Sequence, residues 1–555
     1  MEWWSDLWLN EGFATWVGWL AADHLFPEWD IWTQFLVDDA SQGLHLDCLR
    51  SSHPIEVPVR NPSEISQIFD SISYSKGASV IRMLVAYLGE DVFQRGMRAY
   101  LRKHQYSNAC TADLWAALGE ASGKPVKDIM YTWTQQMGFP LVQVQEQMQD
   151  GKKHLHVCQH RYLTGADVKP EEDLLWHVPL SIASKNANGF DYMNNMMSKR
   201  EENITLPSDC QYYKLNHNQT GFYRVLYPES AISKLAEAAL KGELKAGDRL
   251  GLIADAFAMS SDGYTSASTP LSLLSKFQNE TDYLVWGEIA SHLSHLQNVW
   301  WQQPQQVRDD IQHYTRNLFH KISRKLGFDF HSSDDDKTTL LRALAISQSA
   351  KNGDEEIITE ALERFKQFIA GDSSRIHPNL RGTIFSLAVK HGKAAEYDAV
   401  MKIYEQSSIV DEKLAALAAL GSTKCHATLL STLELTLGDK VRSQDVIYIF
   451  RSVALNIEGR PLAWPFVKKH YSFFHDKFYS ASTALLSRII SSTTEVHADV
   501  AMAEDLESFF KGKQVEAVQR TILQSSEKIR ANASYLNKNC KAVAEFLRKA
   551  LSSAL

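Results

Sequence analysis

The sequence predicts a multidomain α+β protein built from three consecutive parts. The chain of 555 residues is too long for a single hydrophobic core, and the spacing of its apolar residues changes twice. Apolar residues recur every three to four positions over residues 1–138, alternate with polar residues over 139–228, and return to helical spacing over 229–555. A helical region, a small β-sandwich and a large α-helical region should therefore follow one another.

The first region is expected to be mainly helical. Helical spacing is clear in ASVIRMLVAYLGEDVFQRGMRAYLRKH and in TADLWAALGEASGKPVKDIMYTWTQQMG. Thr111 and Asp113 offer side-chain oxygens that can cap a helix N-terminus, while Gly138 and Pro140 provide a stop. The opening segment carries tryptophans that we expect to fill the core: Trp3, Trp4, Trp8, Trp16 and Trp19.

Alternation identifies the second region as strands. It is seen in LVQVQEQ, HLHVCQH, HVPLSIAS, ENITLP and GFYRVLY, which are separated by turn-rich stretches such as MQDGKK and NHNQTG. Several short strands within about ninety residues are typical of a small β-sandwich.

The third region reads as one helix after another, broken by GDR, SSDG, NGDE, AGDSS and EGRP. Many short helices in tandem predict an α-helical solenoid of the HEAT or armadillo kind, although no strict repeat is visible. Such a superhelix would offer a concave surface to a substrate or partner. The acidic run Asp334–Asp336 is interpreted as the start of a helix, where negative charge suits the helix dipole.

Composition narrows the classes of partner and compartment. A net charge of −8 argues against nucleic acid and against an anionic membrane surface as partners. No apolar run reaches the ~18–20 residues that a membrane helix needs. The six cysteines are scattered and form no Cys-x-x-Cys pair, so a reducing compartment and a cytoplasmic location are predicted.

Complete catalytic motifs are absent from the sequence. It contains no His-Glu-x-x-His zinc helix, no Gly-x-Ser-x-Gly elbow, no phosphate-binding loop and no dinucleotide-binding glycine triplet. In HLHVCQH, alternation places His154, His156, Cys158 and His160 on one strand face. Neighbours at i and i+2 are ~6.6 Å apart, so adjacent pairs could share a metal ion but all four could not. We interpret them as an ordinary polar face.

Four further segments give the chain a family resemblance. WWSDLWLNEGFATW, SSHPIEVPV, FDSISYSKGASVIRML and WTQQMGFPLVQV occur in the order found in the gluzincin zinc metallo-aminopeptidases, and they are most similar to the puromycin-sensitive group of that family. The resemblance is strong to about residue 145 and continues more weakly to the C-terminus. It implies that residues 1–138 are the helical C-terminal part of a thermolysin-like catalytic domain.

The resemblance also assigns roles to residues. Glu11, within Asn10-Glu11-Gly12-Phe13-Ala14, matches the third zinc ligand of the family. Tyr74, within Ser-Tyr-Ser-Lys-Gly, matches the tyrosine that stabilises the oxyanion. Asp6 and Asn10 are expected to support the site by hydrogen bonding to ligands.

In the family, the two zinc histidines and the general-base glutamate precede the third ligand in a His-Glu-x-x-His helix. By the family spacing these residues would lie before Met1, so we expect an N-terminally truncated fragment. The intact enzyme would bind one Zn²⁺ and remove N-terminal amino acids from peptides. This chain alone should be inactive and bind zinc weakly, its partners being peptide substrates and the missing N-terminal half. The alternative is a non-catalytic module that binds peptides or a partner through its helical superhelix.

Overall fold

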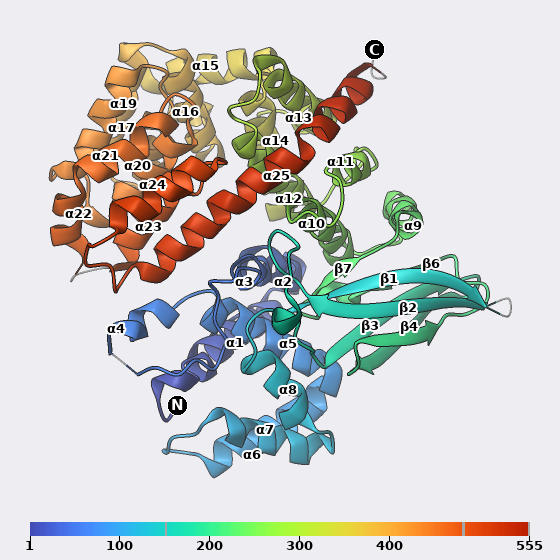
Figure 1. The fold of residues 1–555 in the computed structure, drawn as a ribbon. Helices are drawn as coiled ribbons and strands as arrows, with labels where there is room; N and C mark the ends of the chain where they lie inside the picture. The colour runs from blue at the N-terminus through green and yellow to red at the C-terminus, as the bar shows by residue number, and fades with distance from the viewer. Residues whose placement is uncertain (61, 150–151, 480–482, 553–555) are drawn as a thin grey trace. The chain divides into compact units, whose positions relative to one another are not determined.

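The computed structural model describes residues 1–60, 62–149, 152–479 and 483–552. The predicted mixed α+β class is confirmed, because the chain is mainly helical and contains two small sheets (Figure 1). The chain divides into two compact units, and the boundary lies between Glu288 and Ile289, inside α12 (Tyr283–Val299). The three-part division at residues 138 and 228 stays a prediction.

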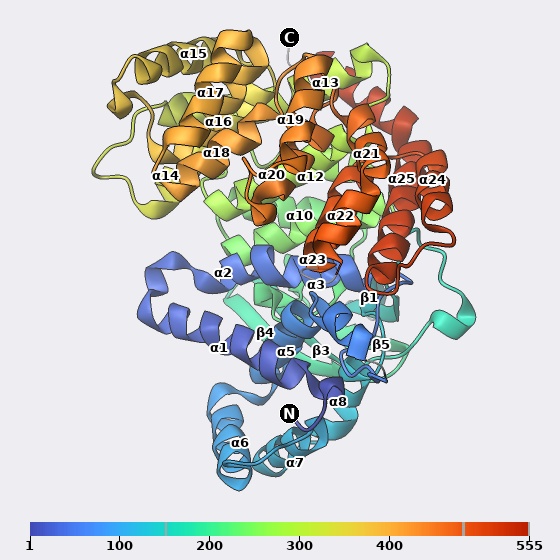
Figure 2. The same cartoon turned by 90° about the vertical axis from the view of Figure 1, so that its left-hand side faces the viewer.

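Unit 1 begins with helices. They are α1 (Trp8–Leu25), α2 (Ile31–Phe35), α3 (Ser41–Asp47), α4 (Pro62–Ile65), α5 (Gly77–Leu88), α6 (Glu90–Lys103), α7 (Thr111–Ser122) and α8 (Val126–Thr134). Two single π-helical turns, η3 (Leu36–Ala40) and η5 (Ile72–Lys76), interrupt the regular helices. Helix α1 packs on α5 and η5, and Figure 2 shows α6 and α7 side by side.

The tryptophans of the opening segment do not share one environment. Trp8 and Trp16 are buried, with Trp8 stacked on Trp115 at a ring-centroid distance of 5.6 Å. The prediction that all of the tryptophans fill the core is wrong for Trp3, whose side chain is 57% exposed. Its indole nitrogen instead donates a hydrogen bond to the Val59 carbonyl at 3.3 Å.

The start of α7 is capped largely as predicted. The Asp113 carboxylate accepts a hydrogen bond from the Cys110 backbone N–H at 3.1 Å, which is one half of a capping box. The Thr111 hydroxyl has a different role. It donates to Asp6 Oδ1 at 2.6 Å and accepts from the Trp8 indole at 3.0 Å, so it ties the start of α7 to the segment around α1.

The strands form a four-stranded and a three-stranded sheet. Their bounds are β1 (Pro140–Gln149), β2 (Lys152–Arg161), β3 (Val178–Asn186), β4 (Gly189–Met197), β5 (Glu201–Thr205), β6 (Tyr212–Leu215) and β7 (Arg224–Leu226). The sheet orders are β5-β2-β1-β7 and β4-β3-β6. Alternation did not predict β4 or β6, because β4 is an edge strand with only one buried residue and β6 is buried on both faces.

Unit 1 ends with the helices that follow the strands, namely α9 (Glu229–Leu240), α10 (Ala246–Ser261), α11 (Ser268–Leu274) and the first part of α12. Helix α10 contacts β7. There, Arg224 Nη1 of β7 lies 3.1 Å from Asp255 Oδ1 of α10, and both side chains are buried. This pair fixes α10 against the sheet.

The regular secondary structure of unit 2 consists of helices in its described residues. After the end of α12 come α13 (Gln305–Leu326), α14 (Asp336–Lys351), α15 (Glu355–Ile369), α16 (Arg381–His391), α17 (Ala394–Gln406), α18 (Val410–Leu420), α19 (His426–Glu434), α20 (Val446–Leu455), α21 (Arg460–Lys469), α22 (Tyr471–Phe478), α23 (Thr483–Thr494), α24 (Val500–Phe510) and α25 (Gln519–Ser552). The predicted helix start in the acidic run is confirmed, since Asp335 accepts from the Thr338 N–H.

One apolar core runs through unit 2, from Ile346 to Ile529. The long helix α25 packs on α24 and α23 and also on α13 near the beginning of the unit. It therefore connects the last helices of unit 2 to its first ones. Among the helices of the described residues, none combines the length and apolar character needed to cross a bilayer.

Candidate active site

The two residues singled out from separate motifs meet in the structure. Glu11 lies in the first turn of α1 and Tyr74 in the π-helical turn η5, each half-buried. Partial burial raises the pKa of Tyr74 to about 12, and a hydrogen bond to Glu11 together with the Glu11 charge adds to the effect. The phenol therefore stays protonated at neutral pH beside the Glu11 carboxylate.

A close crossing of two glycines brings these residues together. A Cβ atom on Gly12 would lie 3.1 Å from the Gly77 Cα and carbonyl carbon, and one on Gly77 would lie 3.2 Å from the Gly12 Cα. Backbones approach this closely only where side chains are absent. Gly12 directly follows Glu11, and Gly77 closely follows Tyr74. The crossing therefore sets the position of Glu11 relative to Tyr74.

Gly12→Ala should lower the free energy of unfolding by about 1–3 kcal/mol, the usual cost of overpacking. Alanine favours helix formation by about 1 kcal/mol, but η5 and the start of α5 are held too firmly to move away from the new methyl group. Urea unfolding followed by tryptophan fluorescence measures the change. Gly18→Ala is the matched control, since Gly18 is an exposed glycine of the same helix with no other atom within 4 Å of the place a methyl group would take. It should stabilise the protein, and equal effects of both substitutions would contradict the close crossing.

Hydrogen bonds hold η5 at its beginning and in its middle. Asp70 Oδ1 accepts from the backbone N–H groups of Ile72 at 2.9 Å and Ser73 at 3.3 Å, which satisfies donors at the start of the turn. The Ser75 hydroxyl donates to Asp39 Oδ1 at 2.9 Å, and Asp39 Oδ2 accepts from the Trp19 indole at 2.6 Å. π-Helical turns are frequent at functional sites.

A buried ion pair holds the end of η5. Lys76 Nζ lies 2.7 Å from Asp47 Oδ2 and donates to the Gly138 carbonyl at 3.0 Å, and both charged side chains are fully buried. Asp47 Oδ1 accepts from the Gly138 N–H at 3.0 Å. Burial lowers the pKa of Lys76, while the charge and hydrogen bond of Asp47 oppose that shift. Within η5, Tyr74 is thus the residue left half-exposed between buried neighbours.

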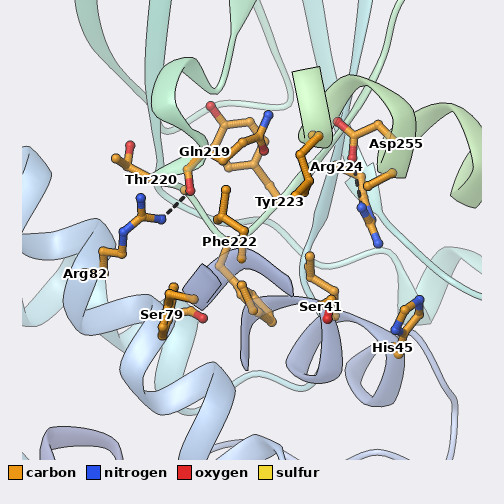
Figure 3. A pocket seen from close by; sticks show the side chains of 18 of the residues that line it. Ser41, His45, Ser79, Arg82, Gln219, Thr220, Phe222, Tyr223, Arg224 and Asp255 are labelled. Carbon is orange, nitrogen blue, oxygen red and sulfur yellow. Dashed lines mark hydrogen bonds and ion pairs between the residues drawn. The ribbon is translucent and has the colours of Figure 1, made fainter. Parts of the chain in front are cut away.

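The helix that follows Tyr74 is also held further along. Arg82 of α5 donates to the carbonyl oxygen of Gln219 at 2.5 Å (Figure 3). It also donates to the carbonyl oxygen of Asn218 at 3.2 Å. Asn218 and Gln219 both have left-handed backbone angles, with φ of 57° and 51°. A cavity of about 40 Å³ lies between this loop and α5, bordered also by the buried Arg224 side chain. The contacts fix α5 against the loop that precedes β7.

A larger hollow lies beside the site without including it. It measures about 1330 Å³ and runs along the face of α1 that carries Phe13, Val17 and Leu20, opposite residues of α6. Its lining contains neither Glu11 nor Tyr74. The hollow is therefore separate from the pair that carries the candidate chemistry.

The two supporting residues behave differently from each other. Asp6 Oδ1 accepts hydrogen bonds from the N–H and hydroxyl of Thr111, at 3.1 and 2.6 Å, so this oxygen caps α7. Asn10 is exposed beside Glu11 on the first turn of α1. The hydrogen bonds of Asp6 with Thr111 do not involve Glu11. The proposed roles of Asp6 and Asn10 in orienting metal ligands stay predictions.

The described residues supply few metal donors. Within the described ranges, no three His, Cys, Asp or Glu side chains are grouped closely enough to hold a metal ion. Alternation on β2 does place His154, His156, Cys158 and His160 on one face, as predicted, opposite the buried Leu155, Val157 and Gln159. The four do not converge on one point: His154 contacts Thr205 and His156 contacts Asn203, whereas Cys158 and His160 contact each other.

Sequence reasoning missed the residues that position the pair. Gly12 and Gly77 stand out only as parts of motifs, and no local pattern marks Asp39, Asp47 or Asp70. One available signal was Lys76, a charged residue directly before the apolar run GASVIRML. A lysine at the start of a buried helix needs a buried carboxylate partner, but the sequence does not say which aspartate supplies it.

Two domain families match the chain. Residues 1–133 match the Peptidase family M1 domain, and residues 212–531 match the ERAP1-like C-terminal domain. The chain is 36% identical over 549 residues to "Aminopeptidase 2, mitochondrial" of Saccharomyces cerevisiae. The aligned residues cover 99% of this chain and 57% of the yeast protein. It is also 36% identical over 547 residues to Aminopeptidase M1-A of Oryza sativa subsp. japonica, covering 97% of this chain and 61% of the rice protein.

Aminopeptidase M1 of Arabidopsis thaliana is 34% identical over 553 residues, with 97% of this chain and 62% of the plant protein covered. The chain spans about three fifths of the length of these relatives. The family predicted from the sequence motifs is thereby confirmed: the chain belongs to peptidase family M1, the gluzincin aminopeptidase family.

Proposed function

We propose that this chain carries one zinc ligand, Glu11, and the oxyanion-stabilising tyrosine, Tyr74, of an aminopeptidase that removes N-terminal amino acids from peptides. The observation that supports this most strongly is the close crossing of Gly12 and Gly77, which brings Glu11 and Tyr74, residues of separate motifs, close enough for the Glu11 charge to raise the pKa of Tyr74. Family membership and the names of the relatives support the reaction class.

The donors present fit zinc only in part. Hydrolytic zinc sites use three protein ligands and leave one position open. Glu11 would supply one carboxylate oxygen, and the two histidines would come from a His-Glu-x-x-His segment that the sequence does not contain. When bound, Zn²⁺ would supply a water of lowered pKa and would polarise the substrate carbonyl.

The residues of this chain have two tasks in such a site. Glu11 contributes a negative charge at a position set by the Gly12–Gly77 crossing. Tyr74 would donate a hydrogen bond to the carbonyl oxygen of the substrate, where negative charge develops in the transition state. The anchored turn η5 keeps the phenol in place, so that little reorganisation is needed during the reaction.

Finer features of the architecture belong to the same proposal. We infer that the two sheets pack as a β-sandwich and that the C-terminal helices form a HEAT- or armadillo-like superhelix, with boundaries near residues 138 and 228. Peptides are the proposed substrates. The free state of all six cysteines supports a reducing compartment, and we propose a cytoplasmic location.

The purified 555-residue chain should not release amino acids from aminoacyl arylamides in a chelator-sensitive manner, because a single carboxylate does not retain catalytic zinc. Co-expression with a segment of a relative that carries His-Glu-x-x-His should restore turnover. Chelator-sensitive hydrolysis by the chain alone would contradict the proposal. Peptide binding without turnover in both preparations would favour the alternative of a non-catalytic binding module.

A further inference from the structure

Three side chains on the polar face of β2 and a neighbouring loop form a hydrogen-bonded series. Cys158 Sγ lies 3.2 Å from His160 Nε2, and His160 Nδ1 lies 2.8 Å from Asp173 Oδ2. Cys158 and His160 share a face because side chains alternate along a strand. Asp173 directly follows the short helical turn η6 (Pro170–Glu172). A thiol, an imidazole and a carboxylate therefore lie in the order nucleophile, base and orienting group.

The carboxylate of this series is firmly held. Asp173 Oδ1 accepts from the Arg161 N–H at 2.7 Å and from Arg200 Nη1 at 3.1 Å, and Arg200 Nη2 donates to the Asp173 carbonyl at 2.8 Å. Burial opposes ionisation of Asp173, but the hydrogen bonds from His160 and Arg161 and the Arg200 charge hold its pKa below the ordinary value. An ionised carboxylate only accepts hydrogen bonds, so His160 Nδ1 must be the donor.

That tautomer leaves His160 Nε2 as an acceptor facing the thiol. Burial raises the pKa of Cys158, the negative charge of Glu201 adds to this, and Arg200 opposes it. These effects keep the Cys158 thiol protonated at neutral pH. Cys158 is half-buried, and the His160 side chain is 45% exposed, so a small reagent can reach the pair.

We propose that Cys158 is a nucleophilic thiol that exchanges with small aliphatic disulfides, with His160 as its base and Asp173 as the positioning residue. This site is separate from Glu11 and Tyr74 and needs no metal ion. It would allow the sandwich region to carry a reversible mixed disulfide.

The exchange is balanced without a further reagent. As Cys158 Sγ attacks one sulfur of RS–SR, its proton passes to His160 Nε2. A new Sγ–S bond forms while the S–S bond of the reagent breaks. The departing thiolate takes the proton from His160 and leaves as RSH. Cys158 is oxidised to a mixed disulfide, and one half of the reagent is reduced to a thiol.

The other cysteines provide internal comparisons. Cys48 is buried, and burial raises its pKa to about 12. The Cys210 thiol donates to the Tyr212 carbonyl at 3.3 Å, which is not a base. Cys425 is exposed at the N-terminus of α19, where hydrogen bonds with Thr428 and Ala427 lower its pKa. Cys425 should therefore react as well, but without an imidazole, so the reaction must be followed at each cysteine separately.

The test treats the purified chain with bis(2-hydroxyethyl) disulfide, which is uncharged, and measures the modification rate of each cysteine by peptide mass mapping. His160→Gln should lower the Cys158 rate at pH 7.5 at least about tenfold, because general-base assistance is lost. The Cys425 rate should not change. His154→Gln is the matched control: His154 shares the strand face but contacts Thr205, and its loss should leave the Cys158 rate unchanged.

The pH dependence gives a second readout that needs no variant. The groups facing His160 and Cys158 are Asp173, Arg200, Glu201 and His156, while Gln143 of β1, opposite Cys158, is neutral. A rate that requires a neutral imidazole rises through the range of histidine titration, about pH 5–8, and then levels off. An unassisted thiol instead gains about tenfold per pH unit up to its own pKa, ~8.5 or higher.

A Cys158 rate that levels off supports the proposal. Asp173→Asn should then move the midpoint to lower pH, since the carboxylate no longer stabilises the imidazolium. Equal Cys158 rates in the wild-type chain and in His160→Gln would overturn the proposal, as would an unbroken rise through pH 8.5. Neither result bears on the proposed aminopeptidase site, because no step of the exchange involves zinc, Glu11 or Tyr74.

Discussion

Glu11→Gln should abolish both zinc retention and turnover in the enzyme completed with a His-Glu-x-x-His segment. Glutamine keeps the size of the side chain but removes the negative charge that a carboxylate ligand brings to the metal ion. The loss of activity should exceed the ~10–100-fold that follows when only an outer hydrogen-bonding partner of a ligand is removed. Metal analysis of the purified complex and arylamide hydrolysis measure the two effects on the same sample.

The fold should survive this change. The Glu11 carbonyl oxygen accepts a hydrogen bond from the Thr15 hydroxyl at 2.7 Å. Because this bond uses the backbone, the substitution leaves it unchanged. Asp23→Asn, near the other end of α1, is the matched control and should retain zinc and activity. If Glu11→Gln retained both, Glu11 would not be a ligand, and the spacing of the family motif would not apply to this chain.

Tyr74→Phe should lower kcat by about 10²–10³-fold while zinc stays bound, which is the usual cost of removing one oxyanion donor. The ring would keep its place near Phe69, at a centroid distance of 6.4 Å, so only the hydroxyl is lost. Because this donor acts on charge that develops in the transition state, KM should change much less than kcat. Steady-state kinetics with metal analysis distinguishes these quantities.

Tyr87→Phe is the control for this substitution. Tyr87 lies on α5, and its ring is covered by Lys124 Nζ at 3.8 Å from the centroid, a contact that phenylalanine keeps. Its activity should equal that of the unmodified enzyme. Full activity of Tyr74→Phe would remove the tyrosine from the mechanism. Loss of zinc together with kcat would instead show that Tyr74 acts by holding Glu11.

Local sequence was sufficient for features that depend on neighbouring residues. Asp335 caps α14 and Asp113 accepts at the start of α7, because a capping oxygen reaches N–H groups only two or three residues away. Alternation located β1, β2, β3, β5 and β7, because each of these strands overlaps one of the alternating stretches in the sequence. The family followed from short motifs, whose order along the chain is itself a property of the sequence.

Strands β4 and β6 were beyond that reasoning. On β4 the exposed edge position removes the need for apolar residues, and on β6 burial of both faces removes the alternation. Both strands are edges of the same sheet, and how far each is buried depends on which other elements cover it. That arrangement is decided by tertiary packing.

The order of residues was enough to predict the family, the helical and strand regions and the candidacy of Glu11 and Tyr74. Tertiary packing was needed to bring Glu11 beside Tyr74, to bring Gly12 and Gly77 into close contact, and to pair Lys76 with Asp47. It likewise joined His160 to Asp173, which turned a polar strand face into a candidate nucleophilic site. These contacts join residues distant in sequence, and their geometry depends on how whole helices and strands pack, which no local pattern of residues specifies.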